Sequence, residues 1–141
     1  MKILLTTDGS KHSLATLQSF AERRTMFAGP LEVTLLNVHL PVPYSRAVAW
    51  VGKENVERYY DEECDEALKP GAELLDQKGV AHTKAKRHGD PASEIVKFAD
   101  EWGADLIVTG THGHSAVTNL VIGSVAQKVL AQTTRPILLL K

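Results

Sequence analysis

At 141 residues the chain has the length of one ordinary globular domain, and one hydrophobic core is expected. Hydrophobic residues make up 43% of it and charged residues 23%, which excludes an intrinsically disordered chain. Sixteen basic and seventeen acidic residues leave a formal net charge of −1, and no Lys/Arg run exceeds two residues. The balance therefore predicts no general binding to nucleic acid or to an anionic membrane surface.

The N-terminus and the apolar runs predict a cytoplasmic protein. Residues 1–8 lack the apolar region of a signal peptide, and no stretch approaches the roughly 18–20 apolar residues that span a bilayer. Cys64 is the only cysteine, so an internal disulfide is impossible and a cysteine-based zinc site is not expected.

Apolar runs alternate with longer amphipathic ones along the first half of the chain. Residues 2–6 predict a buried strand, and Ser10 is placed to cap a helix that runs to about residue 27, before Gly29-Pro30. Residues 31–39 predict a second strand. A strongly charged helix is expected over 53–78 with Gly79 as its end, and Pro70 is expected to kink it or divide it into two.

The second half of the chain continues the alternation. Residues 80–87 alternate in polarity as a half-exposed strand at a sheet edge does. Asp90-Pro91 is a typical helix start, and the apolar residues from Ala92 to Trp102 recur at helical spacing. Residues 104–109 predict a buried strand, 124–132 a helix and 136–140 a last strand.

This element order predicts one doubly wound α/β domain covering residues 1–141. Strands and helices that alternate form a parallel sheet with right-handed crossovers and helices on both faces. For five strands we expect the Rossmann-like order 3-2-1-4-5. Ligands of such sheets bind where the strand order reverses, here between the first and fourth strands.

Two loops leave the sheet at that point, and the second favours phosphate. The first is Thr7-Asp8-Gly9-Ser10, and the second opens with Gly110-Thr111-His112-Gly113 and closes, nine residues later, with Gly123-Ser124. Its three glycines permit positive φ angles and a close approach of backbone N–H groups to an anion. Ser124 and Val125 would lie in the first turn of the next helix, where the helix dipole favours negative charge. Glycines are also common in structural turns, so the spacing alone leaves that reading open.

The glycine spacing resembles the signature of the universal stress protein family: glycine, two residues, glycine, nine residues, glycine, then Ser or Thr. Gly110, Gly113, Gly123 and Ser124 match every fixed point. The opening Thr7-Asp8-Gly9-Ser10 and the closing stretch from Ser124 to Leu140 are similar to the family's ends, so the likeness covers essentially the whole chain.

The resemblance implies an ATP site and assigns its residues. Asp8, with Thr7 beside it, would lie by the adenine or ribose, and the backbone of Val38 would contact the base. The ribose and phosphates would be held by Gly110, Gly113, Gly123, Ser124 and Val125. Because the nine residues between Gly113 and Gly123 contain no Lys or Arg, phosphate charge would be met by backbone, by His114, by Mg²⁺ or by residues elsewhere.

The resemblance also implies a homodimer, often formed through the last strand in this family. Ile137, Leu138, Leu139 and Leu140 are four consecutive apolar residues on an expected edge strand, which a partner would protect from aggregation.

Three functions remain open from the sequence. The first is a nucleotide-dependent regulatory or stress-response module. The second is a slow ATPase on the same site, for which Asp8 is the only nearby carboxylate and no catalytic residue is assigned. The third is a dimeric interaction protein with no bound nucleotide. We expect no metal site at His112 and His114, because no third ligand lies nearby.

Overall fold

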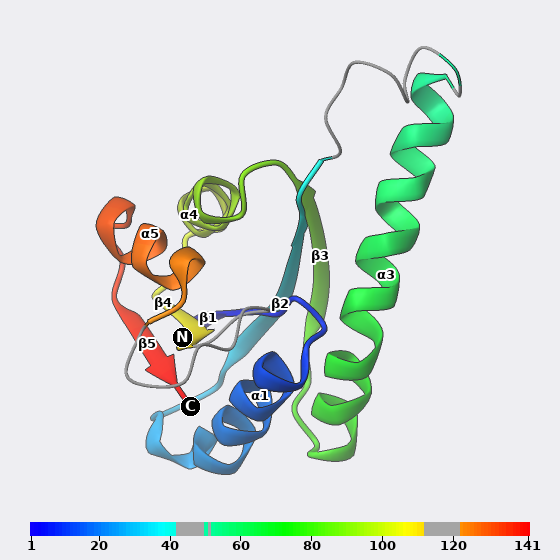
Figure 1. Cartoon of the computed structure of the whole chain (residues 1–141). Helices are drawn as coiled ribbons and strands as arrows, with labels where there is room; N and C mark the ends of the chain where they lie inside the picture. The colour runs from blue at the N-terminus through cyan, green and yellow to red at the C-terminus, as the bar shows by residue number, and fades with distance from the viewer. Residues whose placement is uncertain (42–49, 51, 112–121) are drawn as a thin grey trace.

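The computed structural model describes residues 1–41, 50, 52–111 and 122–141. Its sheet contains β1 (Lys2–Thr6), β2 (Glu32–His39), β3 (Thr83–His88), β4 (Leu106–Gly110) and β5 (Ile137–Leu140). All neighbouring strands are parallel and their order is β3-β2-β1-β4-β5. The predicted doubly wound five-stranded sheet is therefore confirmed, with the reversal between β1 and β4 (Figure 1).

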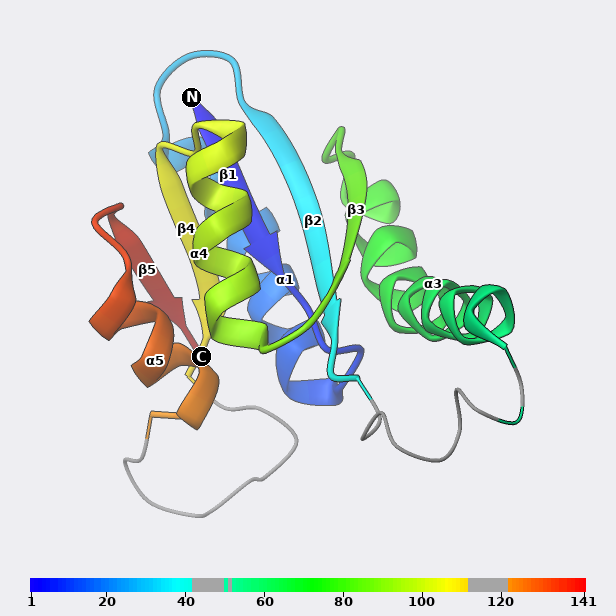
Figure 2. The same cartoon turned by 90° about the horizontal axis from the view of Figure 1, so that it is seen from above.

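The helices cover both faces of the sheet, as Figure 2 shows from above. α1 (Lys11–Arg23), the short 3-10 turn η1 (Arg24–Met26) and α3 (Lys53–Gln77) lie on one face, and α4 (Pro91–Trp102) and α5 (Ser124–Gln132) lie on the other. Alternate residues along each strand point to opposite faces, so each face has its own core. Leu5, Leu17 and Leu35 are fully buried on the α1/α3 face, and Leu4 and Ile107 are fully buried on the α4/α5 face.

Local capping explains where two of these helices begin. The Ser10 side chain accepts from the Ser13 N–H at 3.2 Å at the start of α1. Asp90 accepts from the Ser93 N–H at 3.0 Å, and Pro91 occupies the first position of α4, where its missing N–H costs nothing. The backbone bond from Ser93 is the main cause that lowers the pKa of the Asp90 carboxyl.

Pro70 does not divide the long helix, which was one of the two outcomes predicted for it. α3 is continuous from Lys53 to Gln77 with Pro70 inside it. A proline in a helix removes one N–H bond to the preceding turn, and its ring crowds the carbonyl four residues earlier. The buried side chains Cys64, Leu68 and Leu75, which lie before and after it, anchor the helix to the sheet on both sides.

The two sheet edges are β3 and β5, as predicted. β3 begins three residues later than expected, because Val80 caps the C-terminus of α3: its N–H donates to the Leu75 carbonyl at 2.9 Å and its side chain is buried. In the part of the chain that the structure describes, no helix is both long and apolar enough to cross a membrane.

Candidate functional site

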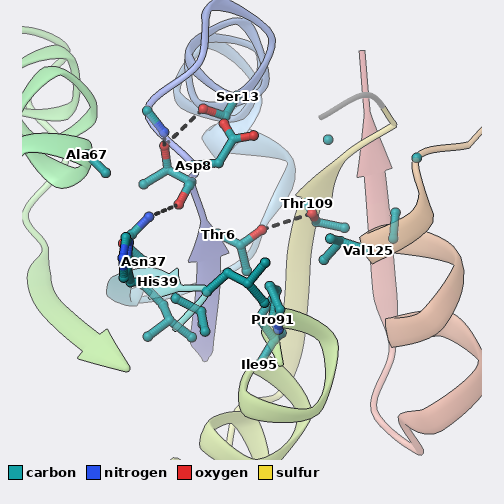
Figure 3. A pocket seen from close by; sticks show the side chains of 18 of the residues that line it. Thr6, Asp8, Ser13, Asn37, His39, Ala67, Pro91, Ile95, Thr109 and Val125 are labelled. Atoms are coloured by element: carbon teal, nitrogen blue, oxygen red, sulfur yellow. Dashed lines mark hydrogen bonds between the residues drawn. The ribbon is translucent and has the colours of Figure 1, made fainter. Parts of the chain in front are cut away.

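A cleft of about 830 Å³ opens at the carboxyl ends of the central strands, where the strand order reverses. A volume of this size is typical of small-molecule sites. Its walls come from β1, β2, β4 and α3 and from the N-terminal turns of α4 and α5 (Figure 3). Its lining includes Thr7, Asp8, Val38, Gly110, Gly123, Ser124 and Val125, which are all of the predicted binding residues that the structure describes.

Two predicted site residues, Gly113 and His114, lie outside the described residues, as does His112. The loop that contains them is nevertheless closed at its base. The Gly123 N–H donates to the Thr111 carbonyl at 2.6 Å, and the Thr111 N–H donates to the Leu140 carbonyl at 3.0 Å. Gly110 and Gly123 therefore lie close together at one end of the cleft.

A set of side-chain hydrogen bonds positions the loop that follows β1. The Ser10 N–H donates to Asp8 Oδ1 at 2.9 Å, and the Asn37 side chain donates to the Thr7 carbonyl at 2.8 Å from the end of β2. The Thr7 and Ser13 hydroxyls lie 3.0 Å apart and share a hydrogen bond. These bonds fix Asp8, which is half-buried, at the lip of the cleft.

Gly9 allows this loop to pack directly against α3. Its φ of +77° is a left-handed conformation that side chains disfavour. An added Cβ would lie 3.1 Å from both Cα and the carbonyl oxygen of Ala67. The close contact makes α3 one wall of the cleft.

One part of the cleft is apolar and lies between β2 and α4. Leu36 and Val38 contribute from β2, and Pro91 and Ile95 from the first turns of α4. These side chains offer no charged group, so the chemistry of this wall suits a flat apolar or aromatic moiety.

The opposite part of the cleft is the N-terminus of α5. Gly123 precedes the helix, and within the described ranges no side chain caps the N–H groups of the first turn. Ser124 and Val125 are exposed there. Unpaired N–H groups and the helix dipole together favour an anion at this end.

Gly110 and Gly123 do not adopt the positive φ angles that the sequence analysis expected of them. Gly123 has a φ of −55°, and Gly110 is the last residue of β4, paired with Leu140, so neither needs the positive φ that was expected. Any residue can adopt an extended backbone. What a glycine supplies at these positions is the missing Cβ beside the cleft.

The sequence suggested that Asp8 is the only carboxylate near the site, and this expectation is wrong. Glu63 and Glu66 line the cleft from α3. Among the described residues, however, no group of three or more His, Cys, Asp or Glu side chains is arranged to hold a metal ion.

The comparisons with known proteins agree with this geometry. The model of the universal stress protein family matches residues 1–141. The chain belongs to that family. It is 34% identical over 140 residues to the universal stress protein MJ0531 of Methanocaldococcus jannaschii, a match that covers 99% of this chain and 81% of the relative.

Solved structures of universal stress proteins share the fold. The protein MJ0577 of Methanocaldococcus jannaschii superposes with a TM-score of 0.76 at 28% identity, covering 99% of this chain and 94% of that one. The universal stress protein of Archaeoglobus fulgidus in complex with dAMP has a TM-score of 0.67 at 24% identity, covering 100% and 98%. Two more distant structures of the same fold hold cAMP and AMP, at 22% and 15% identity.

In this universal stress protein the cleft also contains residues that the sequence analysis missed. They come from five elements, β1, β2, α3, α4 and β4, and they include Thr6, Asn37, His39, Glu63, Glu66, Ala67, Pro91, Ile95 and Thr109. Polar residues at strand ends, such as Thr6 and Asn37, were a usable signal because carboxyl ends of parallel strands meet at one edge. The α3 residues gave none, because their contact with the β1 loop spans distant parts of the chain.

His39 is the most unusual of the missed residues. Its Nε2 atom is buried and has no hydrogen-bond partner among the described residues. Its ring lies against Tyr60, with 5.1 Å between ring centroids, and faces Tyr59 edge-on at 6.1 Å. His39 therefore packs against two tyrosine rings beside the cleft.

Cys64 has no catalytic geometry either. It is 2% exposed, and its Sγ lies 3.7 Å from the Arg87 carbonyl, to which it donates. Burial is the main cause that raises the pKa of its thiol. The thiol therefore stays protonated and unreactive near neutral pH.

Proposed function

We propose that the cleft binds an adenine nucleotide, with ATP as the expected ligand, and that its occupancy makes the protein a nucleotide-dependent regulatory module. One observation carries this proposal: an apolar wall and a helix N-terminus that no described side chain caps line the same cleft. A nucleotide is a ligand with a flat base at one end and anionic phosphates at the other. The cleft offers a matching environment for each end.

We propose a role for each part of the cleft. The base would lie against Val38, Pro91 and Ile95, and Asp8 would accept from the base or the ribose at the lip. The phosphates would bind the N–H groups of the first turn of α5 together with the Ser124 hydroxyl. Gly113, His114 and accompanying Mg²⁺ belong to the same proposal, through the loop that lies outside the described residues.

Other members of the family support an adenine ligand. Solved universal stress protein structures with this fold were determined with dAMP, cAMP and AMP. These three ligands share the adenine base and differ in the sugar and phosphate. In this proposal their common part, the adenine, would lie against the apolar wall described above.

A slow ATPase on the same site is the second candidate function. It is favoured by Glu63 and Glu66, which bring two further carboxylates to the cleft as possible general bases. Release of phosphate from ATP by the purified protein, abolished by Glu66→Gln or Glu63→Gln, would support it.

Ser124 provides the sharpest test of nucleotide binding. Ser124→Asp and Ser124→Asn have nearly the same shape and differ by one negative charge. An aspartate in the first turn of α5 should stabilise the unliganded protein by about 0.3–1 kcal/mol through the helix dipole. The same charge should repel the phosphates, so we expect ATP affinity at least about tenfold lower than that of Ser124→Asn.

Calorimetric titration with ATP and urea unfolding of the unliganded variants measure the two effects. Opposite signs for stability and for affinity support a phosphate site at this helix end. Equal ATP affinities for the two variants would contradict it.

A further inference from the structure

Two buried threonine hydroxyls form the floor of the cleft at the point where β1 and β4 meet. Thr6 Oγ1 donates to Thr109 Oγ1 at 2.8 Å, and the two side chains are 8% and 7% exposed. Both line the cleft, and Figure 3 shows the pair at its centre, with Val125 beside it and Pro91 and Ile95 from α4 below.

Strand geometry places the two hydroxyls on one face of the sheet. Leu4 of β1 pairs with Ile107 of β4, and both belong to the core beneath α4 and α5. Side chains two residues further on point to the same face, and these are Thr6 and Thr109. The hydroxyl pair therefore replaces apolar core at the last position before the strands end.

The hydrogen bonding of this pair is incomplete without a ligand. A hydroxyl has one proton to donate and two lone pairs. Because Thr109 accepts from Thr6, its own proton remains to be donated, and no acceptor for it occurs among the described residues. Thr109 lines the cleft, so its hydroxyl can donate this proton to a ligand bound there.

We infer that the Thr6–Thr109 pair recognises a sugar hydroxyl of the bound nucleotide, an inference that rests on the function proposed above. The pair presents a donor, on Thr109, next to free lone pairs on Thr6. A hydroxyl group both accepts and donates, and so it can satisfy both at once, whereas a phosphate oxygen only accepts. The pair lies between the apolar wall and the N-terminus of α5. A nucleotide with its base on that wall and its phosphates at that helix end would place its sugar over the pair.

This role makes Thr109 a specificity-determining residue, because a ligand that lacks the hydroxyl leaves buried polar groups unpaired. Sites built to pair with a hydroxyl discriminate strongly against analogues without it. The wild-type protein should therefore bind ATP at least about tenfold more tightly than one of its 2′-deoxy and 3′-deoxy analogues.

The decisive experiment measures the affinities of ATP, 2′-deoxy-ATP and 3′-deoxy-ATP by calorimetry for the wild type and for threonine variants. Thr109→Val should weaken ATP binding about tenfold and lose the preference over the deoxy analogue, while Thr109→Ser should retain both. The analogue comparison on the wild type and on Thr109→Ser keeps the test valid if Thr109→Val folds poorly.

The chain contains a matched control for the valine substitution. Thr34 of β2 and Thr83 of β3 form another hydroxyl pair, 2.9 Å apart, with Thr34 buried and neither residue lining the cleft. Thr34→Val should change stability without changing affinity or sugar preference.

The outcomes separate the two proposals. Equal binding of ATP and both deoxy analogues by the wild type, or an unchanged preference in Thr109→Val, overturns sugar recognition while nucleotide binding stands. A wild-type protein that binds no adenine nucleotide overturns both.

Discussion

Short polar side chains at the ends of strands link the elements that form this site through buried hydrogen bonds. Thr6, Thr7 and Asn37 each bond to a group on another strand, helix or loop at 2.8–3.0 Å, and all three are buried. A buried hydrogen bond contributes about 0.5–1.5 kcal/mol, and loss of one partner costs about 1–3 kcal/mol. Such bonds hold the cleft in shape before any ligand arrives, which reduces the entropy lost on binding.

Gly9 and Gly29 form a matched pair for testing how tightly the first loop packs on α3. Both have a left-handed φ, +77° and +76°, but only Gly9 has neighbours within 4 Å of an added Cβ. Gly29→Ala should therefore cost only the conformational term of about 1–2 kcal/mol. Gly9→Ala should cost about 1–3 kcal/mol more, because the methyl group meets the Ala67 backbone.

Urea unfolding of the two alanine variants measures this difference. A Gly9→Ala variant no less stable than Gly29→Ala would show that the loop and α3 do not pack as described.

Among the elements, α3 packs tightly on the sheet but contains a proline that removes one of its backbone hydrogen bonds. Leu68 and Leu75 are almost fully buried on the sheet, while Pro70 removes one backbone bond from the middle of the helix. The carbonyl that loses its partner is that of Glu66, four residues earlier, and Glu66 lines the cleft.

Pro70→Ala should stabilise the protein, by up to about 3 kcal/mol, because it restores a helical N–H and removes a poor helix former. Pro91→Ala is the control, since proline is favourable at the first position of α4. That change should be neutral or destabilising by up to about 1 kcal/mol, through the greater freedom of the unfolded chain.

Thermal and urea unfolding of both variants supply the comparison. A destabilised Pro70→Ala would mean that the proline packs productively in α3, contrary to this account.

The sequence predicted the elements well where one periodicity dominated. Buried strands such as 104–109 and the capped start of α4 at Asp90-Pro91 needed only local pattern, and the strand order followed from right-handed crossovers. Of the two outcomes predicted for Pro70, the division of the helix does not occur, because tertiary burial on both sides of the proline outweighs one missing bond. The α3 wall of the cleft was missed because the contact between Gly9 and Ala67 joins segments that no local pattern relates.

At the scale of the whole molecule, the two edge strands differ in how they are protected. β3 carries Lys84, Lys86 and Arg87, charges of the kind that discourage pairing with another chain. β5 is four apolar residues with half-buried side chains. We propose that a second copy of the chain covers β5, which would link the nucleotide sites of two protomers through β4 and the Thr111–Leu140 hydrogen bond.

Leu139→Pro tests that dimer. The carbonyls of Pro136 and Leu140 accept from β4, so in a parallel strand the backbone of Leu139, one residue out of step, points away from β4. A proline there removes an outward N–H without breaking the β4–β5 ladder, and it should shift the protein from dimer to monomer with the fold retained.

Analytical ultracentrifugation over a range of concentrations, with circular dichroism to verify the fold, decides the matter. A folded Leu139→Pro dimer, as tight as the wild type, would place the interface elsewhere.

The central claim is that this universal stress protein binds an adenine nucleotide in the cleft at the carboxyl ends of β1, β2 and β4. The most direct measurement is thermal unfolding of nucleotide-stripped protein with ATP, ADP, AMP and GTP in the presence of Mg²⁺. Ligand at about 100 times its dissociation constant adds roughly 2.7 kcal/mol, enough to raise the melting temperature by several degrees. The account predicts such a rise with adenine nucleotides and none with GTP; no rise with any of the four would contradict it.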